Sequence, residues 1–261
     1  MLMHLEYYIA DPTGNITILV SSQVPINERI DTAARLMEKE KSAEQVGFIE
    51  AGTERADITL NMAGGEFCGN AALSAAALYV LERGVKDKVR VKVSGEENPV
   101  EVEITASSGR GFEGTVEMPL PIGFDSIMLE YGGTEYCVPV VQFKGISHAV
   151  CENMALPDSI ENAAKKWCRD LNADAFGIMQ IDSANNKLLP YVYVEKSGTG
   201  FWESSCASGT TAAGYYLAMS RGCDRLEKCF SEPAGELRIK YINGRLFLSG
   251  KVTIYEKKRE G

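Results

Sequence analysis

The chain has 261 residues, of which 45% are hydrophobic and 24% are charged, and its formal net charge at pH 7 is −9. This length suits one large or two modest domains, and the negative charge argues against nucleic-acid binding, which normally needs a basic surface. No stretch of the sequence approaches the roughly 18 apolar residues of a membrane span, and the N-terminus lacks a basic start followed by an apolar core. These features predict a cytoplasmic protein with neither a nucleic-acid nor a membrane partner.

The cysteine content indicates reduced thiols. Seven cysteines are present, and an odd number in a chain without an export signal argues against a disulfide framework. No Cys-x-x-Cys pair occurs, and the two histidines are His4 and His148, so the ligand spacing of a zinc site is missing. We therefore expect no metal and no other cofactor.

The first half of the chain predicts a helix and two strands before the first cysteine of interest. Two β-type runs, 46–49 and 57–62, precede a glycine-containing loop that leads to Cys68. Ahead of them, apolar spacing favours an amphipathic helix over 26–41 whose apolar side carries Ile30, Ala33, Ala34, Leu36 and Met37.

A second helix is expected after Cys68. Alanine and other small residues make the run 70–82 apolar on nearly all sides, which predicts a buried helix that ends at Arg83-Gly84. Two strands, 100–105 and 115–118, follow with a turn at 107–111. The stretch 109–114 spells GxGxxG, but no helix opens after it, so a glycine-rich hairpin turn is favoured over a dinucleotide site.

The same succession returns beyond the prolines and glycine of 119–124. A Gly/Ser-rich loop leads to Cys206, and the helix that follows ends at Arg221-Gly222. The turn of the last predicted hairpin is Asn243-Gly244. The expected elements are helices over 158–171 and 208–220 and strands over 176–180, 190–195, 237–242 and 246–254.

A constant offset relates the two halves. The differences 206 − 68, 213 − 75, 221 − 83 and 222 − 84 all equal 138. We therefore predict an α/β protein of two pseudo-symmetric lobes from an internal duplication, each a curved mixed or antiparallel sheet wrapped around a central helix. The lobes are expected at 1–121, carrying Cys68, and 122–261, carrying Cys206, with a cleft between them. The last strand is free to pair with the other lobe.

Each cysteine lies at the start of a predicted helix. Unpaired N–H groups and the positive end of the helix favour an anion there, so we expect a lowered thiol pKa and a place for a small carboxylate. Small residues beside both cysteines would let a ligand approach the backbone: Gly69, Asn70, Ala207, Ser208 and Gly209.

Two thiols at one cleft predict a specific chemistry. One thiolate would remove a proton from a carbon next to the carboxylate, and the opposite thiol would return one to the other face. Such a pair inverts a stereocentre without a cofactor. Packing in the core is the usual role of a free cysteine, and we assign it to the other five. For Cys68 and Cys206 the matched positions favour catalysis over packing or a redox pair.

The two cysteine segments resemble motifs of a known family. Residues 61–70 (NMAGGEFCGN) and 203–210 (ESSCASGT) resemble the paired motifs of the diaminopimelate epimerase family of cofactor-independent amino-acid racemases and epimerases. Residues 12–15 (PTGN) resemble the family's N-terminal Gly-Asn, and the resemblance extends over essentially the whole chain.

The resemblance implies roles for individual residues. Cys68 and Cys206 would be the acid–base pair, and His148 with a glutamate would orient the thiols. That glutamate is Glu195, which ends its strand as the family's does, or Glu203, which lies closer to Cys206 in the sequence. The residues placed at the substrate are Asn15, Gln45, Asn61, Gly69, Asn70, Lys196, Ala207, Ser208 and Gly209.

Departures from the family pattern indicate a changed side-chain pocket. Ile146 stands in place of an Asn, and Lys196 in place of an Arg that grips the distal carboxylate of diaminopimelate; Lys does not reproduce such a bidentate contact. Phe201 and Trp202 add bulk near Cys206. We therefore expect a racemase of a single-centre polar or basic amino acid such as histidine, with diaminopimelate epimerase as the alternative.

Two questions stay open at this point. A non-catalytic amino-acid binder or thiol redox switch would use the same cleft, and loss of α-hydrogen exchange would distinguish it from an enzyme. The sequence does not fix the oligomeric state, for which a homodimer is the candidate.

Overall fold

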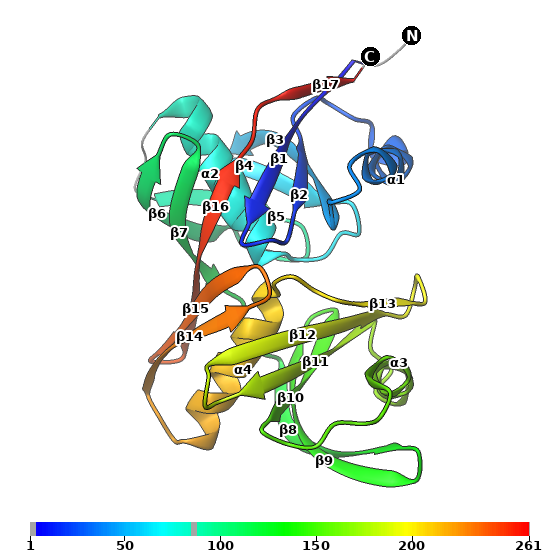
Figure 1. Cartoon of the computed structure of the whole chain (residues 1–261). Helices are drawn as coiled ribbons and strands as arrows, with labels where there is room; N and C mark the ends of the chain where they lie inside the picture. Colours follow the sequence, from blue (N-terminus) through cyan, green and yellow to red (C-terminus); the bar gives the residue numbers. More distant parts are fainter. Residues whose placement is uncertain (1–3, 85–87, 261) are drawn as a thin grey trace. The chain divides into compact units, whose positions relative to one another are not determined.

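The structure is a computed structural model that describes residues 4–84 and 88–260 (Figure 1). Strands dominate it, so the predicted mixed α/β class is confirmed. The chain divides into two compact units, one formed by Met1–Glu117 with Ser249–Gly261 and the other by Met118–Leu248. The end of the chain therefore groups with the first unit, whereas the sequence-based division kept 122–261 together.

The first unit is built from strands that pair in chain order. They are β1 (Leu5–Pro12), β2 (Thr17–Val20), β3 (Gln45–Thr53), β4 (Ala56–Met62), β5 (Lys88–Val93), β6 (Val100–Ser108) and β7 (Gly111–Met118). From β1–β2 onward the pairings are antiparallel, parallel, antiparallel, parallel, antiparallel and antiparallel. The GxGxxG stretch forms the β6–β7 hairpin turn, with Gly109 at φ +61°, which confirms that prediction.

Helix α2 (Gly69–Arg83) packs against β1, β2, β4, β5 and β6 of this unit. Most of its residues are buried, as expected for a run of alanines without a polar face. The helix ends where the N–H of Gly84 donates to the carbonyl of Val80 at 2.9 Å, with Gly84 at φ +94°. The predicted helix and its glycine stop are confirmed.

The predicted apolar side of the first helix is wrong in part. A short 3-10 helix (Ile26–Glu28) leads into α1 (Arg29–Lys39), which buries Thr32, Ala33 and Leu36. Ile30 is 67% exposed and Met37 is 37% exposed. The buried stripe is narrow: Ala33 and Leu36 join the core cluster of β1, β2 and β3, and the flanking apolar residues remain outside it.

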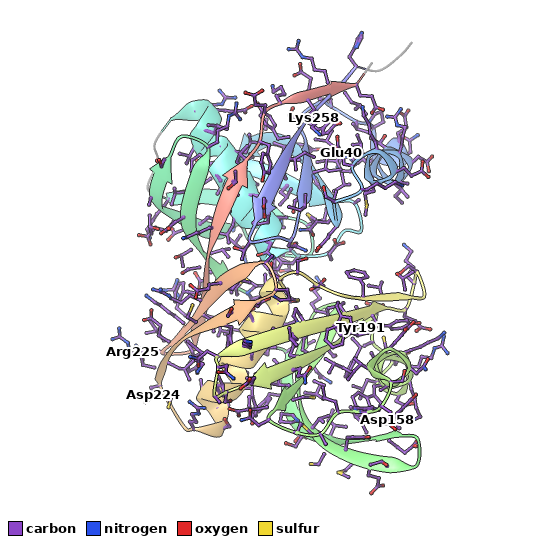
Figure 2. All side chains as sticks on the ribbon, viewed as in Figure 1. Glu40, Asp158, Tyr191, Asp224, Arg225 and Lys258 are labelled. Atoms are coloured by element: carbon purple, nitrogen blue, oxygen red, sulfur yellow. The ribbon has the colours of Figure 1, made fainter. Side chains whose placement is uncertain are left out.

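The C-terminal strands complete the first unit. The end of β16 (Arg245–Ile254) pairs with β1, as does β17 (Lys258–Glu260). Lys258 Nζ lies 2.8 Å from both carboxylate oxygens of Glu40, just beyond α1 (Figure 2). These contacts explain why the last residues belong with the first unit.

The second unit repeats the order of pairings seen in the first. Its elements are β8 (Gly123–Tyr131), β9 (Thr134–Phe143), β10 (Ile146–Glu152), α3 (Ile160–Asp170), β11 (Ala175–Asp182), β12 (Lys187–Val194), β13 (Thr199–Trp202), α4 (Ala207–Ser220), β14 (Arg225–Glu232) and β15 (Gly235–Ile242). From β9–β10 through β10–β11, β11–β12, β12–β14 and β14–β15, the pairings are antiparallel, parallel, antiparallel, parallel and antiparallel.

Helix α4 is the counterpart of α2 within this unit. It packs against β9, β10, β11, β14 and β15 and is largely buried. Gly222, at φ +60°, follows its last turn, as predicted. One segment has no counterpart: β4 and α2 are joined by residues 63–68, whereas β12 and α4 are joined by residues 195–206, which contain β13.

Candidate active site

Cys68 and Cys206 occupy the same position in their two helices. Each immediately precedes its helix, with φ −134° in both and ψ of 115° and 106°. The sulfur of Cys68 accepts from the N–H of Ala71 at 3.4 Å, and that of Cys206 accepts from the N–H of Gly209 at 3.3 Å. Each thiol therefore replaces the capping oxygen usual at a helix start, where the positive helix end favours negative charge. The predicted placement of both cysteines is confirmed.

A chain of polar contacts leads from His148 to Cys206 within the second unit. His148 Nε2 lies 3.0 Å from Ser208 Oγ, and Ser208 Oγ lies 3.6 Å from Cys206 Sγ. His148 comes from β10 and Ser208 from the first turn of α4, which packs on β10. The histidine thus reaches the sulfur through the serine hydroxyl.

The imidazole of His148 is fully buried and neutral. Burial lowers the pKa of His148 to about 3. Gly177 lies directly opposite His148 in the parallel β10–β11 pair, and a Cβ at that glycine would collide with Nδ1 of the ring. Nδ1 has no hydrogen-bond partner among the residues that the structure describes. A glycine in β11 therefore provides the room that this histidine needs.

Two carboxyl groups lie close to Cys206. Glu203 hydrogen-bonds to its thiol, and the buried Glu232 accepts from its backbone N–H at 2.8 Å. Burial, reinforced by the charge of Glu203, raises the pKa of the Cys206 thiol well above its usual value. The expectation that the helix start lowers this pKa is therefore wrong for Cys206, because desolvation and neighbouring negative charge outweigh the favourable dipole.

Glu195 and Lys196 lie at the end of the β12–β13 hairpin. The Glu195 carboxylate forms an ion pair with Arg169 of α3 at 3.0 Å, and its pKa is lowered by hydrogen bonds from Tyr193 and Arg169. Lys196 is exposed. Of the two glutamates that the sequence left open, Glu203 is the one in contact with Cys206.

In the first unit, Asn15 and Gln45 are brought together. Gln45 Nε2 donates to Asn15 Oδ1 at 2.6 Å and to Thr17 Oγ1 at 2.8 Å. Asn15 is 7% exposed, and its Nδ2 donates to Glu44 Oε2 at 2.5 Å. The two predicted substrate residues thus lie in one hydrogen-bonded, partly buried amide cluster beside the starts of β2 and β3.

Asn61, Gly69 and Asn70 belong to the segment around Cys68. Asn61 is half-buried on β4, opposite Phe48 of β3, and Gly69 opens α2. Asn70 is 1% exposed, and its side-chain Oδ1 has no hydrogen-bond partner within residues 4–84 and 88–260. Ala207 and Gly209 hold the matching places in the first turn of α4.

Sequence reasoning missed Glu232. Glu232 is an acidic residue at the end of a strand, directly before Pro233. The offset of the duplication pairs it with Ser94, since 232 − 94 = 138. That match was the available signal. In the described part of the chain, no group of three or more His, Cys, Asp and Glu side chains is placed to hold a metal ion.

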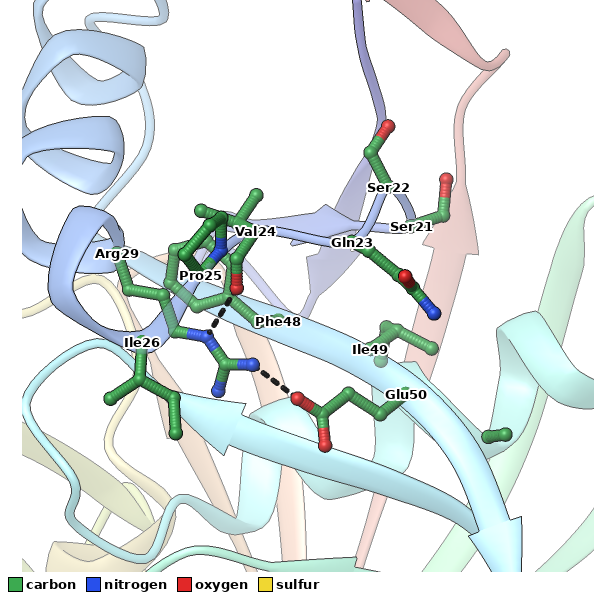
Figure 3. A pocket seen from close by; sticks show the side chains of 11 residues that line it. Ser21, Ser22, Gln23, Val24, Pro25, Ile26, Arg29, Phe48, Ile49 and Glu50 are labelled. Carbon is green, nitrogen blue, oxygen red and sulfur yellow. Dashed lines mark hydrogen bonds and ion pairs between the residues drawn. The ribbon is translucent and has the colours of Figure 1, made fainter. Parts of the chain in front are cut away.

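A separate hollow of about 780 Å³ lies in the first unit and contains none of these residues (Figure 3). Arg29 projects into it, donates to the carbonyl of Val24 and pairs with Glu50. The Arg29 guanidinium also lies 5.2 Å from the centre of the Phe48 ring. Because Arg29 is already paired with Glu50, it offers no unpaired charge to a ligand in this hollow.

Comparison with known proteins decides the family. Residues 4–255 match the family model described as the histidine racemase CntK N-terminal domain. This chain belongs to that family. A histidine racemase of Fusobacterium nucleatum is 34% identical over 260 residues, covering 96% of this chain and 94% of the relative. A histidine racemase of Staphylococcus aureus is 27% identical over 243 residues, covering 90% and 88%.

Solved structures with other names share the fold of this chain. A phenazine biosynthesis protein of the PhzF family from Bacillus anthracis superposes with a TM-score of 0.73 at 12% identity, covering 100% of both chains. A probable proline racemase from Agrobacterium radiobacter gives 0.71 at 11% identity, covering 98% of this chain and 93% of that one. At these identities the likeness concerns the fold alone. The protein is an isomerase of the racemase class, and the resemblance to the cofactor-independent racemases and epimerases is confirmed. Within the described residues, no helix is long and apolar enough to cross a membrane.

Proposed function

We propose that this protein racemises histidine with Cys68 and Cys206 as its two acid–base groups, one removing the α-proton and the other protonating the α-carbon. The observation that carries the proposal is the matched geometry of the two thiols, each capping a buried helix through its sulfur, in a chain of the histidine racemase family. No pyridoxal phosphate takes part in this reaction.

The helix starts supply the binding of the carboxylate. Backbone N–H groups of Gly69, Asn70, Ala207 and Ser208 hold the α-carboxylate of the amino acid, and Gly209, which has no side chain, leaves room for it. The positive helix ends stabilise the negative charge that grows there as the α-proton leaves. One thiolate takes the proton from one face, and the opposite thiol donates a proton to the other face.

Three side chains control Cys206 in this proposal. Ser208 hydrogen-bonds to the sulfur, the neutral His148 fixes the Ser208 hydroxyl, and Glu203 contacts the thiol directly. We assign the supporting glutamate to Glu203 in place of Glu195. The raised pKa of Cys206 favours this residue as the proton donor of the resting enzyme.

The remaining substrate contacts are assigned as follows. Asn15, Gln45, Asn61 and Asn70 serve the amino group and side chain of histidine from the first unit. The buried Oδ1 of Asn70 supports this assignment, because a buried amide oxygen needs a hydrogen-bond donor and the substrate would supply one. The Asn15–Gln45 pair supports it by holding two amide side chains together. Lys196 is the residue that reaches toward the substrate side chain from the hairpin.

The two units are proposed to be copies of one fold. Each would be a lobe with a curved sheet wrapped around its central helix, α2 or α4, and the end of β16 and β17 would join the first lobe. The repeated order of parallel and antiparallel pairings supports the duplication. The β13 segment is then an insertion specific to the second copy.

We further propose that the protein is a cytoplasmic homodimer. Its substrate is a free amino acid. The seven free thiols favour a reducing compartment. Sedimentation velocity would test the dimer, which a single species at 28.5 kDa would contradict.

The test of function is loss of optical activity from L-histidine without added pyridoxal phosphate. Racemisation of histidine, with little or no turnover of LL-diaminopimelate, is the expected result. Turnover of diaminopimelate in preference to histidine would replace the proposal with an epimerase. Binding of amino acids without α-hydrogen exchange would indicate a binder or thiol switch.

A further inference from the structure

The buried carboxyl of Glu232 contacts the start of α4 twice. Glu232 is the last residue of β14 and is 5% exposed. Its Oε2 accepts from the backbone N–H of Cys206 at 2.8 Å, and its Oε1 accepts from the hydroxyl of Thr210. One side chain therefore holds both the reacting residue and the turn that follows it.

The turn after Glu232 fixes the same segment a second time. The N–H of Ala234 donates to the carbonyl of Ser204 at 3.0 Å, and the N–H of Glu203 donates to the carbonyl of Pro190 at 2.9 Å. The loop 203–206 is thus held between β12 and the β14–β15 turn. Within this arrangement, Glu232 is the side chain that reaches the backbone of Cys206 itself.

The equivalent positions of the first unit differ in chemistry. The offset of 138 places Ser94 at the position of Glu232 and Ala72 at the position of Thr210, since 232 − 94 and 210 − 72 both give that number. Ser94 Oγ accepts from the N–H of Met62 and donates to the carbonyl of Glu66, both at 2.9 Å. The loop before Cys68 is therefore held by a neutral hydroxyl, whereas Cys206 is held by an ionisable carboxyl.

Among the described residues, few ionisable groups face this carboxyl. Glu203 and the Cys206 thiol face it from the loop, and Thr210 faces it from α4; His148 is two contacts away, through Ser208. Burial, with Glu203 adding to it, raises the pKa of Glu232 to about 8. Around neutral pH the protonated form is therefore favoured, and its Oε2 still accepts from the Cys206 N–H. Above that pKa the carboxyl adds a second negative charge beside the sulfur.

We propose that Glu232 is the positioning residue of Cys206 and that it makes the second thiol chemically unlike the first. This inference rests on the proposed racemase function and deepens it. Glu232 does not touch the substrate; it fixes the backbone that aims the sulfur, and its ionisation opposes formation of the Cys206 thiolate.

The experiment compares Glu232→Gln and Glu232→Leu with the matched control Glu227→Gln. Glu227 lies on the same strand, is exposed and pairs with Arg238 at 3.5 Å. Two readouts are taken from pH 6 to 10: kcat and KM for L-histidine, and the rate of iodoacetamide alkylation at Cys206 and at Cys68, resolved by peptide mass spectrometry.

We expect the leucine variant to lose roughly 30-fold or more in kcat, with KM changed less than about threefold, because it removes the contact with the Cys206 backbone. The glutamine variant keeps that acceptor and removes the titration. It should retain about a third or more of kcat at pH 7, and its Cys206 should alkylate roughly threefold or more faster at pH 9, with Cys68 unchanged. Glu227→Gln should match wild type in both readouts.

Two results would overturn the proposal: a leucine variant with wild-type kcat, or a glutamine variant with an unchanged pH profile of Cys206 alkylation. If the leucine variant does not fold, the alkylation profile of the glutamine variant decides alone. If no variant and not even the wild type racemises histidine, the proposed function fails, and the alkylation readout still decides whether Glu232 controls Cys206.

Discussion

The imidazole Nε2 of His148 and the hydroxyl of Ser208 lie 3.0 Å apart, and that hydroxyl lies 3.6 Å from the sulfur of Cys206. A histidine from β10 is thereby connected to the thiol by a residue of the first turn of α4. Because burial keeps the imidazole neutral, the contact orients the hydroxyl without adding charge to the site. The hydroxyl of Ser208 therefore links His148 to the Cys206 thiol.

Removal of the Ser208 hydroxyl should weaken catalysis selectively. Ser208→Ala breaks both contacts, so we expect kcat for histidine to fall by about tenfold, equivalent to one lost hydrogen bond of roughly 1.4 kcal/mol. Ser220→Ala, at the far end of the same helix, is the matched control and should leave kcat unchanged. Equal kcat in the two variants would show that the chain from His148 to Cys206 has no catalytic role.

The buried His148 predicts a loss of stability in acid. Its pKa is about 3 in the folded protein and about 6.5 when exposed, so the unfolded chain binds the proton first as pH falls. The free energy of unfolding should therefore fall between about pH 6.5 and 3, by up to about 1.4 kcal/mol per pH unit. Urea unfolding of His148→Gln should lack this slope, whereas His4→Gln should keep it. An identical slope in all three proteins would contradict a buried neutral imidazole.

Gly177 should tolerate no side chain. An added methyl group would meet Nδ1 of His148, so Gly177→Ala should destabilise the fold by about 1–3 kcal/mol and lower kcat by displacing the ring. Gly111→Ala is the matched control, because its added Cβ meets its nearest atom, the carbonyl oxygen of Ser108, at 3.5 Å. Chemical denaturation checks both variants, and comparable stabilities would remove the steric argument.

The choice between Glu203 and Glu195 can be tested directly. Glu203→Gln removes a charge that hydrogen-bonds to the Cys206 thiol, so we expect kcat to change by about tenfold or more. Glu195→Gln removes an ion pair with Arg169 on α3 and should have the smaller effect, since exposed pairs contribute little. The opposite ranking in steady-state assays would return the role to Glu195.

The sequence predicted the two buried helices well, and for a clear physical reason. Each is an alanine-rich run bounded by a cysteine loop and an Arg-Gly stop, so local composition alone fixes α2 and α4 to within about a residue at each end. The offset between Cys68 and Cys206 carried the same information. For these two helices, the local sequence is enough to predict the observed bounds.

Features set by distant segments could not be predicted in this way. The exposure of Ile30 and Met37 depends on how much of α1 the sheet covers. The raised pKa of Cys206 depends on burial and on carboxyl groups supplied by the residues before α4 and by the end of β14. Glu232 escaped notice because its partner lies 26 residues away in sequence, and no local pattern marks that contact.

The most direct test of the two-thiol account is the fate of the α-hydrogen in deuterium oxide. Wild-type enzyme acting on L-histidine should place one deuterium in the D-histidine product, while the recovered L-histidine stays unlabelled at early times. Cys68→Ala and Cys206→Ala should each reduce racemisation by about a thousandfold or more, because either change removes one of the two proton carriers. Wild-type turnover by either variant, or label that enters both enantiomers equally from the outset, would contradict a mechanism in which one thiolate removes the α-proton and the other thiol protonates the opposite face.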